Sequence, residues 1–480
     1  MPGIKLGGFC LLAVLAPVLT AQQRVTAALK PFIDFSDPVI ALEHVRVIDG
    51  TGAAVRAGET IVIDHGKIAA AGPDGAVRVP SGARVLDLTG DTVYPGLIGM
   101  HEHLFYPSFY PPTRLALYAE QAFSAPRLYL ACGITTMRTT GSMEPYTDLN
   151  LKREIQKGNV PGPDMDITGP YLEGPGGFSI QMPVIRTPEQ ARRTVDYWAS
   201  EGVTSFKAYM HISHDALAAA IQEVHRHGLK ITGHLCSVGF TEAADLGIDN
   251  LEHGLIIDSE FTPGKKPNAC PPWNKRVASI EKLDIKGPQV QHLIQTLVKD
   301  KVAVTSTLDV FEAMISGRPP LEQRVLEAMS PQAAESYLAT KAREQPKLSE
   351  TMSRLLKKEM EFERAFVAGG GLLMAGADPT GNGGALPGFG DERNLELLVQ
   401  AGFTPEQAIR IYSWNAAVYL NRSSRIGSIA PGKQADLVVV TGDPSTHIQD
   451  VEHVKYVFKD GIAYDSAKLI ASVRGAVGIH

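Results

Sequence analysis

The sequence predicts an α/β protein: a (β/α)8 TIM-like barrel with a small β-sandwich domain built from both termini. Three observations predict this fold. Between residues 202 and 254, three short β-like runs each follow a helix-like run closed by glycine. Polar residues end these runs at intervals that suit successive units of a barrel of about 250 residues. Finally, β-rich runs separated by Gly, Asp and Pro occur at both ends of the chain and bracket this region.

The length of the chain indicates how many domains it forms, and its net charge excludes nucleic acid as a partner. The 480 residues are accounted for by one barrel with insertions and a small second domain. We place a signal peptide at 1–21, the two parts of the β-sandwich at 22–94 and 422–480, and the barrel at 95–421. The net charge of −6 shows no basic excess, so we expect no nucleic-acid partner.

The N-terminus has the pattern of a secretory signal peptide. Lys5 precedes an apolar run at 9–19, and Leu19-Thr20-Ala21 resembles a small-residue cleavage site. The run is short for a bilayer span, although a short N-terminal anchor is the alternative. We therefore expect an exported protein, periplasmic or secreted, with no membrane span after cleavage behind Ala21.

Three cysteines remain after that cleavage, and an odd number cannot all pair. A disulfide involving Cys270, in a Pro-rich insertion, suits an exported protein, but the spacing does not predict it. We expect Cys236 to be a small buried apolar residue. The third cysteine is Cys132.

The first three barrel strands follow one another from residue 95. The first ends in VYPGLIGMHEHL, which places His101 and His103 beyond it. Since alternate residues of extended chain point to one side, both imidazoles can reach one ion, and Glu102 faces away. ITTMRTT and DMDITGP are the second and third strands, and they end near Arg138 and Tyr171.

The remaining five strands bring four more polar residues to the same rim. Strands four to six are the runs at 203–208, 229–232 and 248–251, which lead to Lys207, His234 and His253. VAVTSTL is strand seven, and GLLMAGADP is strand eight, ending at Asp378. The carboxyl ends of such strands meet at one face of a barrel, so these side chains should gather there.

Helix signals and insertions complete the order. Thr187 and Gln190 form a capping-box pattern before the helix that Gly202 ends, and Thr404 and Gln407 repeat it before the last helix. Insertions at 258–287 and 317–358 follow strands, so they should cover the site as a lid or form an oligomer contact. We expect a homo-oligomer.

Six candidate ligands are more than one zinc ion needs, whereas two divalent ions about 3.5–4 Å apart would use them all. The ammonium of Lys207 repels cations, but carboxylation to a carbamate supplies two oxygens that can bridge two metals. Zinc suits this mixed ligand set best, and manganese, cobalt and iron are alternatives. The six residues are His101, His103, Lys207, His234, His253 and Asp378.

At this point the chain resembles the amidohydrolase superfamily, in its binuclear subtype with a carboxylated lysine. The resemblance rests on PGLIGMHEHL, SFKAY, TGH, LEHG, GADP and GSIAPGKQADLVVVTGDP, and covers nearly all of the mature chain. Among the branches of this superfamily, the chain is most similar to the imidazolonepropionase-like group, which includes prolidase-type dipeptidases. Imidazolonepropionases proper use one metal and lack the bridging lysine, so Lys207 argues against that activity.

The resemblance also implies roles for these residues. His101, His103 and Asp378 would hold one metal ion, His234 and His253 the other, and N6-carboxylysine at Lys207 would bridge the two. A hydroxide shared by both ions would attack the substrate, and Asp378 would move its proton to the leaving amine. We therefore expect hydrolysis of an amide in a small molecule, such as a dipeptide or an N-acyl amino acid.

Substrate contacts are expected just past the strand ends, where an arginine or a histidine–tyrosine pair could hold a carboxylate. A lactonase, an esterase or a deaminase on the same barrel is the alternative activity, and a non-catalytic ligand-binding barrel is the alternative class. The first glutamate after His234 is Glu242, eight residues on, which disfavours deamination. The candidate contacts are Tyr209, His211, Arg138, Tyr171 and Phe178.

Overall fold

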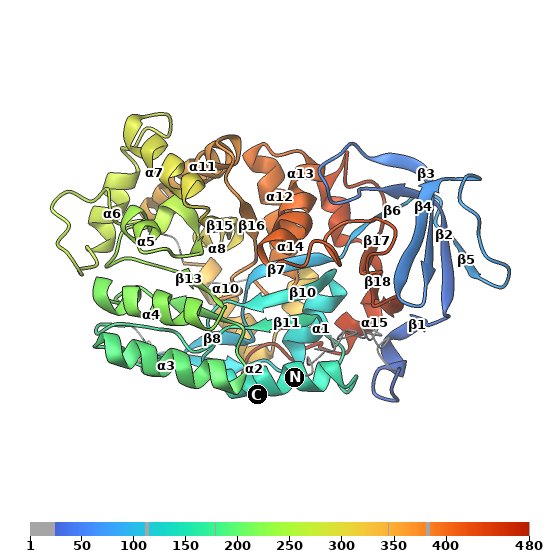
Figure 1. Cartoon of the computed structure of the whole chain (residues 1–480), viewed down its shortest axis with the longest axis horizontal. Coiled ribbons are helices and arrows are strands. Elements are labelled where there is room, and N and C mark those ends of the chain that lie inside the picture. Colours follow the sequence, from blue (N-terminus) through green and yellow to red (C-terminus); the bar gives the residue numbers. More distant parts are fainter. Residues whose placement is uncertain (1–24, 111–114, 178, 344, 381–384, 480) are drawn as a thin grey trace, which may run out of the picture.

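The computed structural model describes residues 25–110, 115–177, 179–343, 345–380 and 385–479, and shows a mixed α/β fold (Figure 1). The predicted signal peptide at 1–21 and the candidate contact Phe178 lie outside these residues. None of the described helices is both long and apolar enough to cross a membrane.

Eight parallel strands form two sheets that follow the chain order. Their sheet orders are β11-β10-β7 and β12-β13-β14-β15-β16. All eight correspond to the strands expected from the sequence. Their bounds are β7 (Leu97–Glu102), β10 (Ile134–Thr139), β11 (Asp164–Ile167), β12 (Ser205–Ala208), β13 (Lys230–Gly233), β14 (Asn250–Glu252), β15 (Ala303–Ser306) and β16 (Leu373–Ala375).

Backbone hydrogen bonds connect the edges of these two sheets. The amide of Gly169, just past β11, donates to the carbonyl of Ser205 at 3.0 Å, and Thr168 forms a parallel bridge to Ser205. At the opposite edges, the amide of Asp378, just past β16, donates to the carbonyl of His101 in β7 at 2.8 Å. The carboxyl ends of the first and last strands are therefore neighbours.

Helices connect the parallel strands, as the apolar periodicity predicted. Thr187 caps α3 by accepting from the Gln190 amide, and Gly202 ends it at a φ of 100°. The connecting helices are α1 (Ser124–Ala131), α2 (Pro145–Gln156), α3 (Pro188–Glu201), α4 (His214–Arg226), α5 (Phe240–Asp245), α6 (Trp273–Ile280), α7 (Pro288–Lys299), α8 (Leu308–Glu312), α9 (Gln323–Ala328), α10 (Pro331–Lys341) and α11 (Pro346–Ala368).

After β16 come α12 (Phe389–Ala401), α13 (Pro405–Arg410) and α14 (Ala416–Tyr419), and α15 (Ser466–Ala471) lies near the C-terminus. Thr404 and Gln407 form the predicted capping box of α13. A π-helical turn at Ile411–Asn415 joins α13 to α14.

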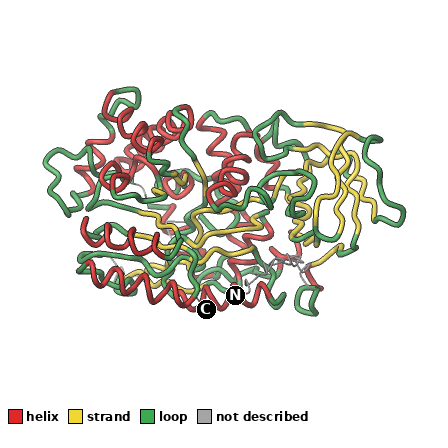
Figure 2. The backbone as a smooth tube through the Cα atoms, in the orientation of Figure 1, coloured by secondary structure: helices red, strands yellow, loops and turns green. Residues whose placement is uncertain are grey.

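A nine-stranded sheet at one end of the molecule contains strands from both ends of the chain (Figures 1 and 2). Antiparallel pairing of β6 with β17 joins the two contributions. The strands are β1 (Ile33–Phe35), β2 (Val39–Val47), β3 (Arg56–Asp64), β4 (Lys67–Pro73), β5 (Arg84–Asp87), β6 (Asp91–Pro95), β17 (Leu437–Thr441), β18 (Val454–Lys459) and β19 (Ile462–Asp465).

One hairpin was not expected from the sequence. It is formed by β8 (Phe105–Tyr110) and β9 (Leu115–Glu120), which follow β7 directly. Pro107 lies within β8, and proline removes a backbone donor, which weakens the local sequence signal for a strand. The hairpin places new side chains beside the end of β7.

Candidate metal centre

The structure brings the six predicted ligands together at the carboxyl ends of the parallel strands. His101 is the second-last residue of β7 and His103 directly follows this strand, while Lys207 lies in β12. His234 and His253 come directly after β13 and β14, and Asp378 lies three residues past β16. Residues separated by 277 positions in the chain, from His101 to Asp378, thus share one site.

The backbone is strained at two of these positions. His253 has a φ of 66° and Asp378 a φ of 44°, in the left-handed region that non-glycine residues rarely adopt. Such conformations persist only where surrounding contacts impose them, and they cluster at functional sites.

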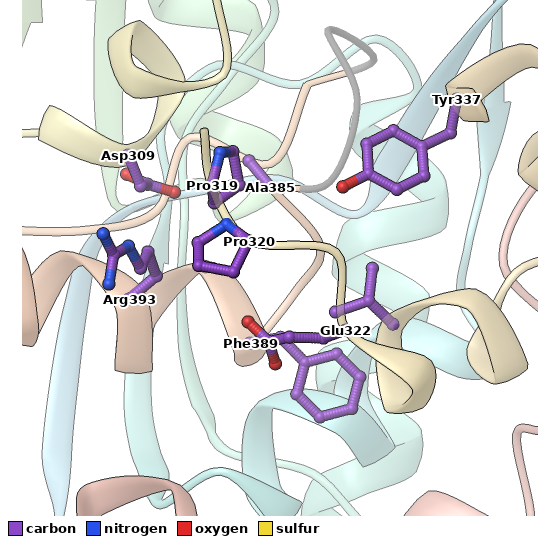
Figure 3. Close-up of a pocket in the computed structure, with 10 residues that line it drawn as sticks. Asp309, Pro319, Pro320, Glu322, Tyr337, Ala385, Phe389 and Arg393 are labelled. Carbon is purple, nitrogen blue, oxygen red and sulfur yellow. The ribbon is translucent and has the colours of Figure 1, made fainter. Parts of the chain in front are cut away.

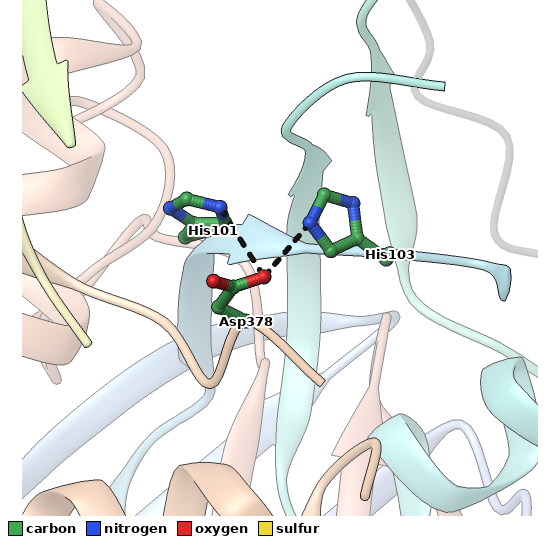
Figure 4. Close-up of side chains that lie close together, drawn as sticks. All are labelled: His101, His103 and Asp378. Carbon is green, nitrogen blue, oxygen red and sulfur yellow. Dashed lines mark ion pairs between the residues drawn. The ribbon is translucent and has the colours of Figure 1, made fainter. Parts of the chain in front are cut away.

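His101, His103 and Asp378 point toward one another, and all three ligand atoms lie within 4.8 Å (Figure 4). Asp378 Oδ1 lies 3.0 Å from His103 Nε2 and 3.6 Å from His101 Nε2. Burial would raise the pKa of Asp378, but the neighbouring histidines outweigh it and hold that pKa well below its usual range. The aspartate is therefore an anion in this site.

His101 is oriented by a buried carboxylate. Its Nδ1 lies 2.7 Å from Glu252 Oε2, and Glu252 Oε1 accepts a hydrogen bond from Arg138 Nη2 at 2.8 Å. The carboxylate can only accept, so Nδ1 carries the proton and the Nε2 lone pair of His101 faces the site. Burial opposes this charge on Glu252, yet His101 and Arg138 bring its pKa to about 2.

Two more histidines are fixed through Nδ1 as well. His103 Nδ1 donates to the Gly141 carbonyl at 3.2 Å, and His253 Nδ1 lies 2.7 Å from the Thr307 hydroxyl. Burial lowers the pKa of His103 to about 4 and that of His253 well below 6.5, so both are neutral near pH 7. Neutral imidazoles with an available Nε2 lone pair are metal ligands.

Lys207 is buried at the centre of this group. Its side chain is 1% exposed, and its Nζ lies 3.0 Å from His101 Nε2. Burial lowers the pKa of Lys207 to about 8, which brings a neutral amine within reach near physiological pH. A neutral amine is the form that can react with CO2.

The residues fit a bound metal. His253 Nε2 is buried and has no hydrogen-bond partner among the described residues. A buried ring nitrogen without a partner is costly unless another group, such as an ion, satisfies it. The His234 ring lies 4.5 Å from that of His253, and the His101 ring 4.6 Å from it.

A cavity of about 260 Å³ opens over this group. Five of the predicted ligands line its polar end: His103, Lys207, His234, His253 and Asp378. The rest of its wall is mainly aromatic and aliphatic. Besides Thr380, that wall consists of Phe105, Pro107, Tyr118, Met143, Tyr171, Met182, Tyr209, Val310, Phe311 and Met314.

Two of the four described substrate-contact candidates line this cavity, Tyr209 and Tyr171. The other two do not. Arg138 is 2% exposed and its guanidinium binds Met100, Asn250 and Glu252 within the strand layer, so it is committed to holding the strands together. His211 is turned to the buried carboxylate of Glu173, at 3.3 Å from its Nδ1.

The cavity wall comes partly from residues that the sequence did not indicate. The β8–β9 hairpin supplies Phe105, Pro107 and Tyr118. Helix α8 supplies Val310 and Phe311, and Met314 lies two residues past the end of α8. Hydrophobic residues without a ligand pattern carry no signal of a site, since the same residues commonly form the core.

The two insertions, at 258–287 and 317–358, which were expected to cover the site as a lid or to form an oligomer contact, contribute no described residue to the cavity wall. Instead Pro319, Pro320 and Tyr337 line a separate small cavity of about 20 Å³ with Asp309 of α8 (Figure 3). This part of the 317–358 insertion therefore lies against Asp309 of α8. The next two residues of that helix, Val310 and Phe311, face the site.

A disulfide fastens the other insertion to the site. Cys236, two residues past His234, is bonded to Cys270, and Cys236 is fully buried as expected. The Ser259 hydroxyl and Lys265 Nζ also donate to the carbonyls of Cys236 and Ser237. Cys132 is buried and free.

Comparisons with known proteins agree with this fold. Residues 327–463 match the profile of the amidohydrolase family. An allantoinase of Streptomyces avermitilis is 34% identical over 125 residues, and adenine deaminase 2 of Jannaschia sp. is 37% identical over 60 residues. These alignments cover 25% and 12% of this chain, and only 26% and 10% of those relatives.

Solved structures are similar over almost the whole chain. A bottromycin amidohydrolase has a TM-score of 0.67 at 18% identity, covering 98% of both chains. A Xaa-Pro dipeptidase with bound methionine has a TM-score of 0.66 at 19% identity, covering 89% of this chain and 100% of that one. The A. niger ochratoxinase has a TM-score of 0.62 at 15% identity, covering 88% and 95%.

The family match is therefore confined to residues 327–463 of this chain. The similar solved structures, which share the fold over most of the chain, are prolidase-like proteins and amidohydrolases.

Proposed function

We propose that this protein is an exported, metal-dependent amidohydrolase that cleaves the C–N bond of an amide in a small molecule. The observation that carries the proposal is the convergence of His101, His103, Lys207, His234, His253 and Asp378 at one end of a cavity. We further propose that the eight parallel strands are a (β/α)8 barrel at 95–421, and that 22–94 and 422–480 form the predicted β-sandwich.

The donor set supports two divalent ions, zinc by preference. His101, His103 and Asp378 would hold one, and His234 and His253 the other. Lys207, as N6-carboxylysine, would contact both. When bound, divalent ions polarise the scissile carbonyl and lower the pKa of water to about 7.

Asp378 is the residue that would move the proton. Its pKa lies well below the usual range, so it is ionised and can accept a proton from the attacking water. That water forms the new C–O bond, and Asp378 passes the proton to the nitrogen as the C–N bond breaks. The products are a carboxylic acid and an amine.

The structure disfavours a deaminase on the same site. Glu242, the first glutamate after His234, belongs to α5, and its carboxylate accepts from the Gly239 amide at the start of that helix. No glutamate is among the described residues that line the cavity. A lactonase or esterase would use the same groups, so the substrate panel must include esters and lactones.

Export is supported by two features. The N-terminal sequence has the charge and apolar run of a signal peptide, and the Cys236–Cys270 disulfide is typical of oxidising compartments.

The Asp378→Asn variant tests the catalytic proposal, with turnover measured on a panel of dipeptides, N-acyl amino acids, neutral amides, esters and lactones. We expect a loss of turnover of about 100-fold or more, since general acid–base catalysis contributes 10²–10⁴-fold. Metal analysis should show that the metal stays bound. Turnover equal to the wild type would instead indicate a non-catalytic barrel.

A further inference from the structure

We infer that the substrate is an uncharged amide that carries an aromatic group beside the scissile bond, and that this group fills the apolar part of the cavity. The inference rests on the proposed function and specifies its substrate class. It narrows the sequence-based expectation, because free dipeptides and N-acyl amino acids bring a carboxylate into the site.

Aromatic rings surround the candidate metal ligands. The ring of Phe105 stacks on His103 at 4.5 Å with an interplanar angle of 23°. The ring of Tyr209 lies 4.9 Å from that of His234, and the ring of Phe311 lies 5.8 Å from that of His253. A substrate group next to the reacting bond therefore meets ring faces and edges, which favour another aromatic ring.

Two separate walls enclose that space. Phe105, Met143, Tyr171 and Met182 pack as one buried cluster on one wall, with Tyr118 and Tyr209 against it. The other wall is α8 and the turn after it, with Val310, Phe311 and Met314. Methionines adapt to irregular shapes and make favourable contacts with aromatic rings.

The volume suits such a group. A dry apolar cavity of about 150 Å³ is sufficient to bind benzene. The cavity of about 260 Å³ therefore has room for one ring and for the amide that joins it to the rest of the substrate.

Outside the candidate ligand group, the walls formed by the described residues offer no positive charge to a substrate carboxylate. Apart from the candidate ligands, the described lining side chains are apolar or carry only a neutral hydroxyl or thioether group. Lys207 is the only lysine or arginine among the described lining residues, and it lies within the ligand group. Burying an unpaired carboxylate against these walls would be costly.

The position of Arg138 strengthens this point. It was the expected partner for a carboxylate, but its guanidinium binds Glu252 and Asn250 in the strand layer. A substrate carboxylate could recruit it only by breaking the contact that fixes Glu252 against His101.

Three substrates with matched structures test the inference: benzoylglycine N-methylamide, benzoylglycine and acetylglycine N-methylamide. The first two differ in the C-terminal group, a neutral N-methylamide against a carboxylate, and the first and third differ in the acyl group, which carries a phenyl ring or a methyl group. With release of benzoate or acetate as the readout, we expect kcat/KM for benzoylglycine N-methylamide to exceed that of either by about tenfold or more. Equal values, or preference for benzoylglycine, would overturn the inference.

A charge-introducing variant gives a second test. Met314 lines the cavity and is half-buried, so a lysine there can reach both solvent and cavity. Met314→Lys should shift the acid-to-amide ratio of kcat/KM toward benzoylglycine by about tenfold, since it supplies the missing cation. Met314→Gln, which has similar size without the charge, should leave that ratio as in the wild type. An unchanged ratio in Met314→Lys would contradict the inference.

Calorimetric binding separates this inference from the proposed function. The metal-loaded Asp378→Asn variant should bind benzoylglycine N-methylamide about tenfold or more tightly than benzoylglycine, without turnover. If the wild type hydrolyses none of the substrates and the variant still shows this preference, the proposed function fails and the inference stands. If amides are hydrolysed but the variant prefers the acid, the inference fails and the function stands.

Discussion

At the residue scale, partners outside the candidate ligand set hold three of its histidines in place. Glu252, Gly141 and Thr307 each contact the Nδ1 atom of one histidine and leave its Nε2 facing the site. The sequence indicated the ligands, because His, Lys and Asp at strand ends have few other uses. It did not indicate Glu252, because its contact with His101 spans 151 residues and exists only in the folded chain.

Lys207→Ala should lose metal and activity together, because it removes the proposed bridge between two ions. Short carboxylic acids such as acetate or propionate should partly restore both, since they can replace the carbamate oxygens. Metal content and amide turnover, each measured with and without the acids, check this. Lys299→Ala, at a lysine 81% exposed, is the control. Full activity in Lys207→Ala would contradict a binuclear site.

Glu252→Gln should weaken zinc binding by about 10–100-fold, because it removes the charge that orients His101 and pairs with Arg138. Chelator competition measures the zinc Kd directly. Glu242→Gln is the matched control, because Glu242 lies on α5 with a side chain 41% exposed. A zinc Kd equal to that of the control would mean that the ligand orientation does not depend on Glu252.

At the element scale, the two insertions pack against the segments that carry the site. The 258–287 insertion is bonded to Cys236, and the 317–358 insertion contacts α8. The disulfide from Cys236 to Cys270 closes a loop of 34 residues that contains β14 and His253 and begins beside His234. The sequence showed that Cys270 could pair but could not select its partner, because pairing depends on two segments meeting in space.

Cys270→Ser should lower the free energy of unfolding by about 4 kcal/mol, the value expected from the loop entropy of that disulfide. Urea denaturation under oxidising conditions measures it. Wild-type protein with a reductant should match the variant, and the variant itself should not respond to the reductant. Equal stability of the variant and the oxidised wild type would show that the bond does not form in the folded protein.

Helix α11 buries two carboxyl groups on successive turns, Glu359 and Glu363, facing the strand ends. The Ile256 amide donates to Glu359 Oε2 at 2.8 Å. Burial raises the pKa of Glu363 to about 8, and burial and Glu363 raise that of Glu359 well above 4.5. Near neutral pH the folded protein therefore holds protons that the unfolded chain releases.

The unfolding free energy should consequently fall as pH rises from about 5 to 8, on the order of 1.4 kcal/mol per pH unit for one such group. The sign follows because the folded pKa lies above the unfolded one, so the stabilisation is complete below the unfolded pKa and lost through the folded pKa. Glu363→Gln should flatten the dependence measured by urea denaturation at pH 5, 6.5 and 8. Glu361→Gln, on the same helix, is the control; a wild-type slope in Glu363→Gln would refute the assignment.

At the scale of the whole molecule, the order of strands and helices could be predicted from periodicity and caps. All eight parallel strands and the starts of the helices at 188–201 and 405–410 lie where the pattern placed them. The β8–β9 hairpin and the position of the 317–358 insertion could not be predicted. Both depend on tertiary packing: β8 packs against α10, and the insertion packs against α8. Local propensity does not encode such contacts.

Because the nine-stranded sheet contains strands from both ends of the chain, it cannot be completed before the C-terminal strands have been synthesised. The Thr92 hydroxyl in β6 donates to the carbonyl of Gly442, which lies 350 residues later. At about 5–20 residues per second, β6 waits roughly 20–70 s after its own synthesis before its partner β17 exists. Until then one edge of the N-terminal strands is unpaired, a template for wrong association. The nascent protein therefore cannot complete this sheet until β17, β18 and β19 have been made.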